Sequence, residues 1–255
     1  MNHALIEAMT QGGETSESLA SQVGVDPKSV QRWVNPGVVP HPRHRSTAAR
    51  VLGRDVGELW PSTVRRREPA WFRRWADVER EALSLRSFQL AWIPGLLQTE
   101  AYARATLAGE GLSAAEVDDL VTARIDRQAL LRRDRPPLVV AVIDEMVVRR
   151  TLGNDRAMMR EQCAHLARCA EMPSVQVHVV PVGTGIYPGL GGPFILADMP
   201  DGGRLAHVDG QSQATIIDQP TEVATLDRRW ARISGEALTR AQSLALITEA
   251  ADSWT

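Results

Sequence analysis

The stretch SESLASQVGVDPKSVQRWVN, residues 16–35, decides the fold of the N-terminal part of the chain. Thr15 or Ser16 can cap a first helix, and Gly24 permits the positive φ that a tight turn requires. The pair Asp26-Pro27 then opens a second helix, because it supplies an N-cap residue and a proline at the first helical position. The stretch therefore predicts two short helices joined by a glycine turn.

Small and apolar residues in this stretch fall where two crossed helices would share a core. Ala20 stands where the two backbones approach, and the apolar residues face inward on both helices. The seven matching positions are Leu19, Ala20, Val23, Gly24, Val25, Val30 and Trp33. We therefore predict a helix-turn-helix, with an ordinary helical hairpin as the alternative.

The second of these helices, residues 26–34, would be the one that enters the major groove of DNA. Its outer side would present Lys28, Ser29, Gln31 and Arg32. A glutamine suits adenine, and an arginine suits guanine or a phosphate, so Gln31 is our candidate for reading a base. Lys28 suits a phosphate. The alternative for Arg32 is that its side chain is solvated and contacts no DNA.

The segment PHPRHR, residues 40–45, places a second basic surface next to that helix. We expect contacts to backbone phosphates, which position a protein without reading sequence, although an exposed polar loop is the alternative. The expected contacts are His41, Arg43, His44 and Arg45. Residues 1–67 carry nine basic and six acidic side chains, against 20 and 25 in the remainder, so the first part is the one suited to nucleic acid.

The sequence predicts two domains of different class. Further short helices at 4–10, 43–52 and 55–60 complete an all-α helix-turn-helix domain over residues 1–62, and a proline-bounded, arginine-rich linker spans 63–70. Residues 71–255 alternate between helical and strand-like patterns, so the fold class is α+β, with a mixed sheet of about five strands in the second domain. Strands are expected at 138–143, 175–181, 193–198, 204–209 and 214–218, and helices at 70–88, 113–133, 145–152, 156–170, 221–234 and 237–252.

Several features of the second domain have plain structural interpretations. The helix at 70–88 carries a stripe of Trp71, Phe72 and Trp75. These side chains either pack in the core or contact a partner or a second copy of the chain, and the sequence leaves both alternatives open. The glycine-rich segment 183–192 lacks the spacing of a phosphate loop and is predicted to be a hairpin loop. Glu145 and Arg149 have the spacing of an ion pair on a helix surface.

The sequence offers no set of residues for catalysis, a metal or a cofactor, and the prediction is a non-enzymatic protein. Cys163 and Cys169 lie on one expected helix and are predicted to be buried free thiols. His178 and His207 are expected to be half-buried. The N-terminus is not a signal peptide and no apolar run reaches the length that spans a bilayer, so we expect a cytoplasmic protein without membrane contact.

Residues 16–35, continued by 40–45 and ended by Leu52-Gly53 and Glu58–Pro61, resemble the Cro/C1 (XRE) class of regulators from GC-rich bacteria. Residues 71–252 resemble the uncharacterised C-terminal domain of antitoxin-like XRE regulators, most specifically in IPGLLQTEAYAR, residues 93–104. Weaker similarities are Ile143-Asp144-Glu145 with Arg149-Arg150, and residues 191–194. Around 204–213 the chain departs from the pattern of that family, in which an acidic residue more often follows a hydrophobic strand. Asp209 is the candidate for that acidic residue.

The resemblance implies a transcriptional regulator that binds double-stranded DNA as a homodimer. It also implies that the C-terminal domain binds a small protein encoded by a neighbouring gene. The alternative is a ligand-sensing regulator, with a metabolite pocket between helices and sheet near Tyr102, Tyr187 and Phe194.

Overall fold

A computed structural model describes residues 2–35, 38–54, 56–60, 70–210 and 214–254. The chain divides into two compact units, Met1–Glu68 and Pro69–Thr255. Apart from residue 70, the predicted linker at 63–70 lies outside the described residues. Within the described ranges, every helix is too short or too polar to cross a membrane.

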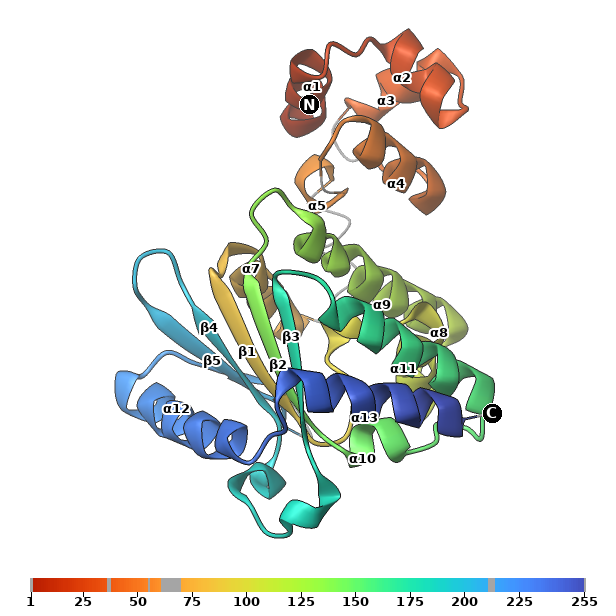
Figure 1. Ribbon diagram of the computed structural model, residues 1–255. Coiled ribbons are helices and arrows are strands. Elements are labelled where there is room, and N and C mark those ends of the chain that lie inside the picture. The colour runs from red at the N-terminus through yellow and green to blue at the C-terminus, as the bar shows by residue number, and fades with distance from the viewer. Residues whose placement is uncertain (1, 36–37, 55, 61–69, 211–213, 255) are drawn as a thin grey trace. The chain divides into compact units, whose positions relative to one another are not determined.

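The N-terminal unit is a small helical bundle (Figure 1). Its described helices are α1 (His3–Gln11), α2 (Ser16–Val23), α3 (Pro27–Trp33), α4 (Pro42–Val51) and α5 (Val56–Leu59). All five match the predicted positions to within two residues. Leu5, Leu19, Val30 and Leu59 are fully buried in one apolar core, so every helix except α4 contributes a large side chain to it. Ala48 of α4 completes that core.

The C-terminal unit is built on a six-stranded mixed sheet (Figure 1). The strands are β1 (Ser84–Gln89), β2 (Leu138–Asp144), β3 (Val175–Val180), β4 (Phe194–Asp198), β5 (Arg204–Val208) and β6 (Thr215–Ile217). Their order is β3-β2-β1-β4-β5-β6. The first three in the chain are parallel, and β4 to β6 join antiparallel on the other side of β1. The predicted α+β class is confirmed.

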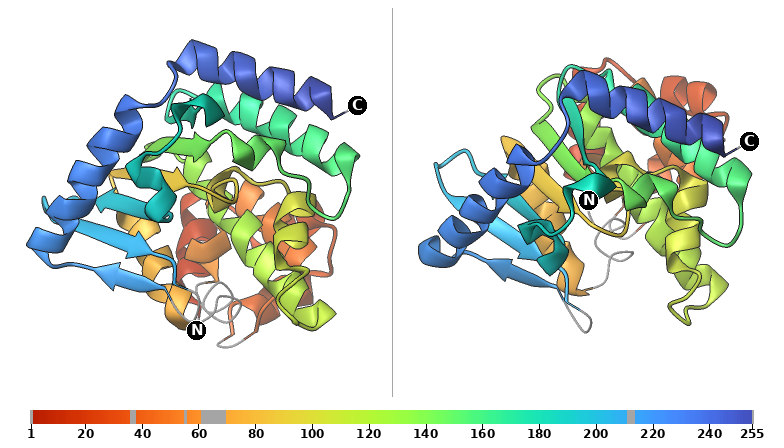
Figure 2. Two further views of the ribbon diagram at one scale, coloured as in Figure 1. Left: turned by 90° about the horizontal axis from the view of Figure 1, so that it is seen from below. Right: turned by 60° about the horizontal axis from the view of Figure 1, so that its bottom comes forward.

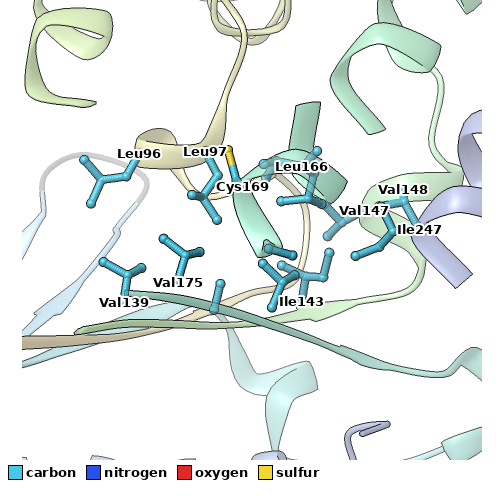
Figure 3. Close-up of a cluster of buried hydrophobic side chains, with 14 of the residues drawn as sticks. Leu96, Leu97, Val139, Ile143, Val147, Val148, Leu166, Cys169, Val175 and Ile247 are labelled. Atoms are coloured by element: carbon cyan, nitrogen blue, oxygen red, sulfur yellow. The ribbon is translucent and has the colours of Figure 1, made fainter. Parts of the chain in front are cut away.

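Helices cover both faces of this sheet, unequally (Figures 1 and 2). One face carries α7 (Ala70–Glu81), α8 (Glu100–Leu107), α9 (Ala114–Arg127), α10 (Met146–Arg149), α11 (Arg156–Ala170) and α13 (Arg240–Ser253). The opposite face packs against α12 (Pro220–Gly235). Figure 3 shows the larger core, where Val139, Ile143 and Val175 of the sheet lie opposite apolar side chains such as Leu97 and Leu166. Cys163 and Cys169 are buried free thiols there, as predicted.

The predicted helix at 70–88 is wrong at its C-terminal end. The helix stops at Glu81, and SLRSFQ forms β1, the central strand, which pairs with both β2 and β4. Ala82 and Leu85 are three residues apart, so they fit a helix pattern, but Leu85 belongs to one core and Phe88 to the core on the opposite face. Pairing with β2 and β4 therefore overrides the helical spacing of the local sequence.

Two other helix predictions are shortened. The segment at 145–152 forms only one turn, α10, and extended backbone at Arg150 ends it. The segment at 113–133 ends as an α-helix at Arg127 and continues as the 3-10 helix η2 (Gln128–Arg132).

The glycine-rich segment 183–192 is not a hairpin loop. A hairpin joins neighbouring antiparallel strands, whereas β3 and β4 are separated by β2 and β1. The segment is instead a crossover from one half of the sheet to the other, containing the short 3-10 helices η3 (Val182–Thr184) and η4 (Pro188–Gly191). Local sequence shows that two strands follow each other but not that they lie apart in the sheet.

Candidate nucleic-acid interface

The corner between α2 and α3 is held by hydrogen bonds at each helix end. Thr15 caps α2 by accepting from the Ser18 backbone N at 3.1 Å. Gly24 ends α2 with φ of 76°, and its N–H donates to the Ala20 carbonyl at 2.9 Å. Asp26 then starts α3 by accepting from the Lys28 backbone N at 2.8 Å. These bonds fix the direction in which α3 leaves the turn.

The inner side of this corner is apolar, as the sequence pattern predicted. Ala20 and Val30 are fully buried, and Trp33 is buried at the end of α3. Val23 and Val25 are partly buried and pack against the same core. The two helices therefore share their apolar faces, and α3 has only its outer side left for a ligand.

The outer side of α3 carries polar side chains. Lys28, Gln31 and Arg32 are exposed, and Ser29 is partly buried. Among the residues that the structure describes, no side chain or backbone group forms a hydrogen bond or ion pair with the side chains of Lys28, Gln31 or Arg32. Their donors and acceptors are therefore available to a partner.

The start of α4 lies against the end of α3 through aromatic contacts. The ring of His44 stacks on Trp33, with centroids 6.5 Å apart, and His41 meets His44 edge-on at 6.0 Å. Arg43 Nε donates to His44 Nε2 at 3.2 Å. Burial, followed by the charges of Arg43 and His41, lowers the pKa of His44. His44 is therefore neutral at neutral pH, while the exposed Arg43 brings a permanent charge beside α3.

Arg45 departs from the predicted basic surface, because it is only 2% exposed. Once α4 begins at Pro42, residues 45, 48, 49 and 52 fall on one side of the helix, which is the side that packs inward. Ala48, Ala49 and Leu52 belong to the core, and Arg45 shares their side. Applying the helical spacing to 42–52 would have shown this from the sequence.

Asn2 is a residue of this unit that the sequence reading missed. Its Oδ1 accepts from the Leu5 backbone N at 3.1 Å and so caps α1. Its Nδ2 donates to the Leu59 carbonyl at 2.7 Å, and its backbone N donates to the Val34 carbonyl at 2.8 Å. One side chain thus joins α1 to α5, while its backbone reaches the end of α3. Asparagine is a common N-cap, so the capping role was visible, but the distant partners were not.

In the C-terminal unit, the three aromatic residues proposed to line a metabolite pocket do not come together. Tyr102 lies in the core on one face of the sheet, whereas Tyr187 and Phe194 lie in the core on the other face. The Tyr102 hydroxyl accepts from the Ile93 backbone N at 3.2 Å, and burial raises its pKa to about 12. The Tyr187 hydroxyl donates to Asp144 Oδ2 at 2.7 Å. All three are buried side chains of the fold.

A surface hollow of about 440 Å³ contains none of these three residues. It lies along α12 and β6 and is lined by Ile217, Thr221, Glu222, Thr225, Leu226 and Arg229. The prediction that Tyr102, Tyr187 and Phe194 line one pocket is therefore wrong, because the sheet separates Tyr102 from the other two.

The segment IPGLLQTEAYAR is held by a buried polar network. Gln98 Nε2 donates to the Ile93 carbonyl at 2.6 Å, and Gln128 Nε2 donates to the Gln98 carbonyl at 2.6 Å. Gln162 donates to the Leu97 carbonyl at 2.9 Å and accepts from the Thr99 backbone N at 2.6 Å. Because buried backbone groups need partners, these glutamines stabilise residues 93–99, which precede α8 and lie outside any strand or α-helix.

Other predicted side chains of the second unit have structural partners. Glu145 and Arg149 form the expected ion pair at 3.2 Å. His178 is half-buried, as predicted, with its Nδ1 at 3.0 Å from the Leu238 carbonyl. The same prediction is wrong for His207, which is only 2% exposed because its ring packs against that of Trp75, with centroids 4.8 Å apart. Trp75 is therefore core, while the side chains of Trp71 and Phe72 lie outside the described part of the chain.

Comparison with known proteins identifies the second unit. A family model described as a domain of unknown function, DUF5753, matches residues 72–249. No curated protein and no solved structure matches the chain. The matched range covers more than half of the sequence and includes the sheet and nearly all of its helices. The chain therefore belongs to the DUF5753 family.

Proposed function

We propose that this protein is a sequence-specific, DNA-binding transcriptional regulator of the Cro/C1 (XRE) type, without enzymatic activity. The observation that carries the proposal is the outer side of α3, where three exposed polar side chains stand on a helix whose other side is fixed in the core. A helix presented in this way is what the major groove of DNA admits. A regulator of this kind acts on chromosomal DNA in the cytoplasm.

Each side chain of α3 has a distinct role in this proposal. Gln31 reads an adenine with its amide, because an amide can donate to and accept from the major-groove edge of that base. Arg32 contacts a guanine or a phosphate, and Lys28 and Ser29 hold the backbone near the helix start. Lys28 and Ser29 lie in the first turn of α3, and Gln31 and Arg32 follow one turn further along the same helix.

The beginning of α4 supplies a second contact to the DNA backbone. Arg43 and His41 are exposed there, and the stacking of His44 on Trp33 ties this surface to the end of α3. Phosphate contacts of this kind set the register of α3 without reading bases. Arg45 is removed from the set of phosphate contacts, because its side chain is buried in the free protein.

The DUF5753 unit, in this proposal, binds a protein and not a metabolite. The resemblance to antitoxin-like regulators implies a small partner encoded by a neighbouring gene. The separation of Tyr102 from Tyr187 and Phe194 by the sheet removes the basis on which a metabolite pocket was expected. A pull-down of the neighbouring gene product should recover it, whereas a thermal-shift screen of metabolites should show no stabilisation.

The test of DNA binding uses the promoter of the protein's own or adjacent gene in fluorescence anisotropy at several salt concentrations. Gln31→Ala should relax specificity at one base pair by about 1–3 kcal/mol. Lys28→Ala should weaken binding to all sequences and reduce the salt slope by about 1. Arg228→Ala removes an equal charge from the exposed side of α12 and should behave like the parent. If Gln31→Ala and Lys28→Ala both bind like the parent, α3 is not the reading helix.

A further inference from the structure

Exposed apolar side chains gather at one edge of the sheet. Because β1, β2 and β3 are parallel, their carboxyl ends meet at the same edge, and each is followed by large apolar residues that are 41–97% exposed. We call this set the apolar edge: Trp92, Met146, Val182, Ile186 and Leu190. Figure 1 shows the segment that carries the last three beyond the lower ends of β3 and β4. Large apolar side chains exposed together on a folded protein mark an interaction site.

Four of the five residues of the apolar edge lie in segments without charge, and Met146 lies between Glu145 and Arg149, which form an ion pair with each other. Residues 181–193 and 87–99 contain no charged side chain, although charged residues make up 24% of the sequence. A surface of this composition does not suit DNA, since it offers no cation to a phosphate. It suits an uncharged, apolar protein surface.

The segment is fixed before any partner arrives. The Val182 backbone N donates to Glu145 Oε2 at 2.9 Å, and the Tyr187 hydroxyl donates to buried Asp144. The ring of Tyr187 meets Phe88 of β1 edge-on, with centroids 6.2 Å apart. Gly189 is needed at its position because a Cβ there would overlap both rings. A surface held in this way loses little conformational entropy on binding.

The same contacts decide which class of partner the edge fits. Open α/β sheets bind small ligands where the strand order reverses, which here is between β1 and β4 at their shared end. Tyr187 and Gly189 occupy that position by packing on Phe88. Side chains of the chain itself therefore occupy this position, and Ile186 of the same segment is 97% exposed. The exposed apolar surface fits a protein.

We infer that the apolar edge is the interface through which a second copy of this chain binds. Because the segments 87–99 and 181–193 carry no charge, they can meet their own copies across a two-fold axis without placing like charges together, and such symmetric dimers are the commonest oligomers. The choice of a second copy rests on the proposed function. A two-fold pair of recognition helices reads half-sites about 34 Å apart, so two chains must be held together.

Sedimentation velocity of the full chain over a range of concentrations, without DNA, tests this inference. The parent should be a dimer at micromolar concentration. Ile186→Asp and Val182→Asp should each weaken the dimer by about a hundredfold or more, since each buries a charge twice across the axis. Leu83→Asp is the matched control: Leu83 is 60% exposed just before β1, at the opposite edge of the sheet, and this variant should dimerise like the parent.

A parent that stays monomeric throughout the micromolar range, or unchanged dimers of both edge variants, would overturn the inference. Loss of a small protein partner by Ile186→Asp with the dimer intact would also overturn it, because the edge would then serve that partner. Circular dichroism should show that the variants remain folded, as the substituted side chains are exposed. The Gln31→Ala variant separates the two proposals: it should dimerise like the parent whatever its effect on DNA.

Discussion

The substitution Arg45→Ala tests the assignment of inner and outer surfaces in the N-terminal unit. Arg45 was expected to hold a phosphate but is buried on the side of α4 that carries Ala48, Ala49 and Leu52. If that placement is right, shortening the side chain removes packing from a small core. The main effect should then be on the stability of the unit, with any loss of DNA binding following from unfolding.

The magnitude follows from the groups removed. The substitution deletes two buried methylenes, worth about 0.8 kcal/mol each, together with the guanidinium. The space left behind adds a cavity cost, so the total should be about 2–4 kcal/mol, as for other large-to-small changes in cores. In a unit of this size, 1 kcal/mol shifts the midpoint of thermal unfolding by about 4–8 °C. The variant should therefore unfold its N-terminal helices well before the parent does.

Amide hydrogen exchange followed by mass spectrometry measures this locally. Peptides from α1 to α4 should lose about 2–4 kcal/mol of opening free energy, whereas peptides from the sheet of the C-terminal unit should exchange as in the parent. Arg43→Ala is the matched control, because its side chain is exposed on the same helix. It should leave exchange unchanged and weaken DNA binding. If Arg45→Ala exchanges like the parent while reducing the salt dependence of DNA binding, Arg45 contacts the DNA and is not part of the core.

Three further predictions concern single positions. Tyr187→Phe removes the donor to the buried Asp144 carboxylate and should lower the free energy of unfolding of the C-terminal unit by about 1.5–3 kcal/mol in urea denaturation. Gly24→Ala forces a side chain into a backbone of φ 76° and should cost the N-terminal unit about 1–2 kcal/mol by hydrogen exchange. Burial lowers the pKa of His165 in the folded state, so the unfolded state binds more protons near pH 6, and the free energy of unfolding should fall as the pH drops from 7 through about 6.5. His165→Gln should flatten that dependence.

The N-terminal helices were predictable because short-range rules determine them. Asp26 and Thr15 act as caps, and Gly24 provides the left-handed turn. Each helix boundary is therefore determined by residues no more than three or four positions away. The same rules, carried one helix further, place Arg45 inward. The error came from assigning the whole of 40–45 to one basic surface, although Arg45 already belonged to the predicted helix at 43–52 and shares the side of Ala48, Ala49 and Leu52.

The C-terminal unit was less predictable because its decisive contacts are distant in sequence. SLRSFQ becomes the central strand only through pairing with β2 and β4, which begin 54 and 110 residues later. The crossover at 181–193 looked like a hairpin because strand order is not a local property. The three aromatic residues were grouped without knowing the face of the sheet on which each one lies.

The polar network around residues 93–104 uses its hydrogen-bonding groups within the fold. The side chains of Gln98, Gln128 and Gln162 are buried, and their amides bond to backbone groups of the segment itself. A side chain whose donors are used within the fold contributes to folding and has little left for a ligand. These three glutamines therefore hold residues 93–99 in place. Within the described part of the chain, the outer side of α3 and the apolar edge both keep exposed side chains for a partner, and their chemistry differs: α3 offers hydrogen bonds and charge, whereas the apolar edge offers large apolar side chains.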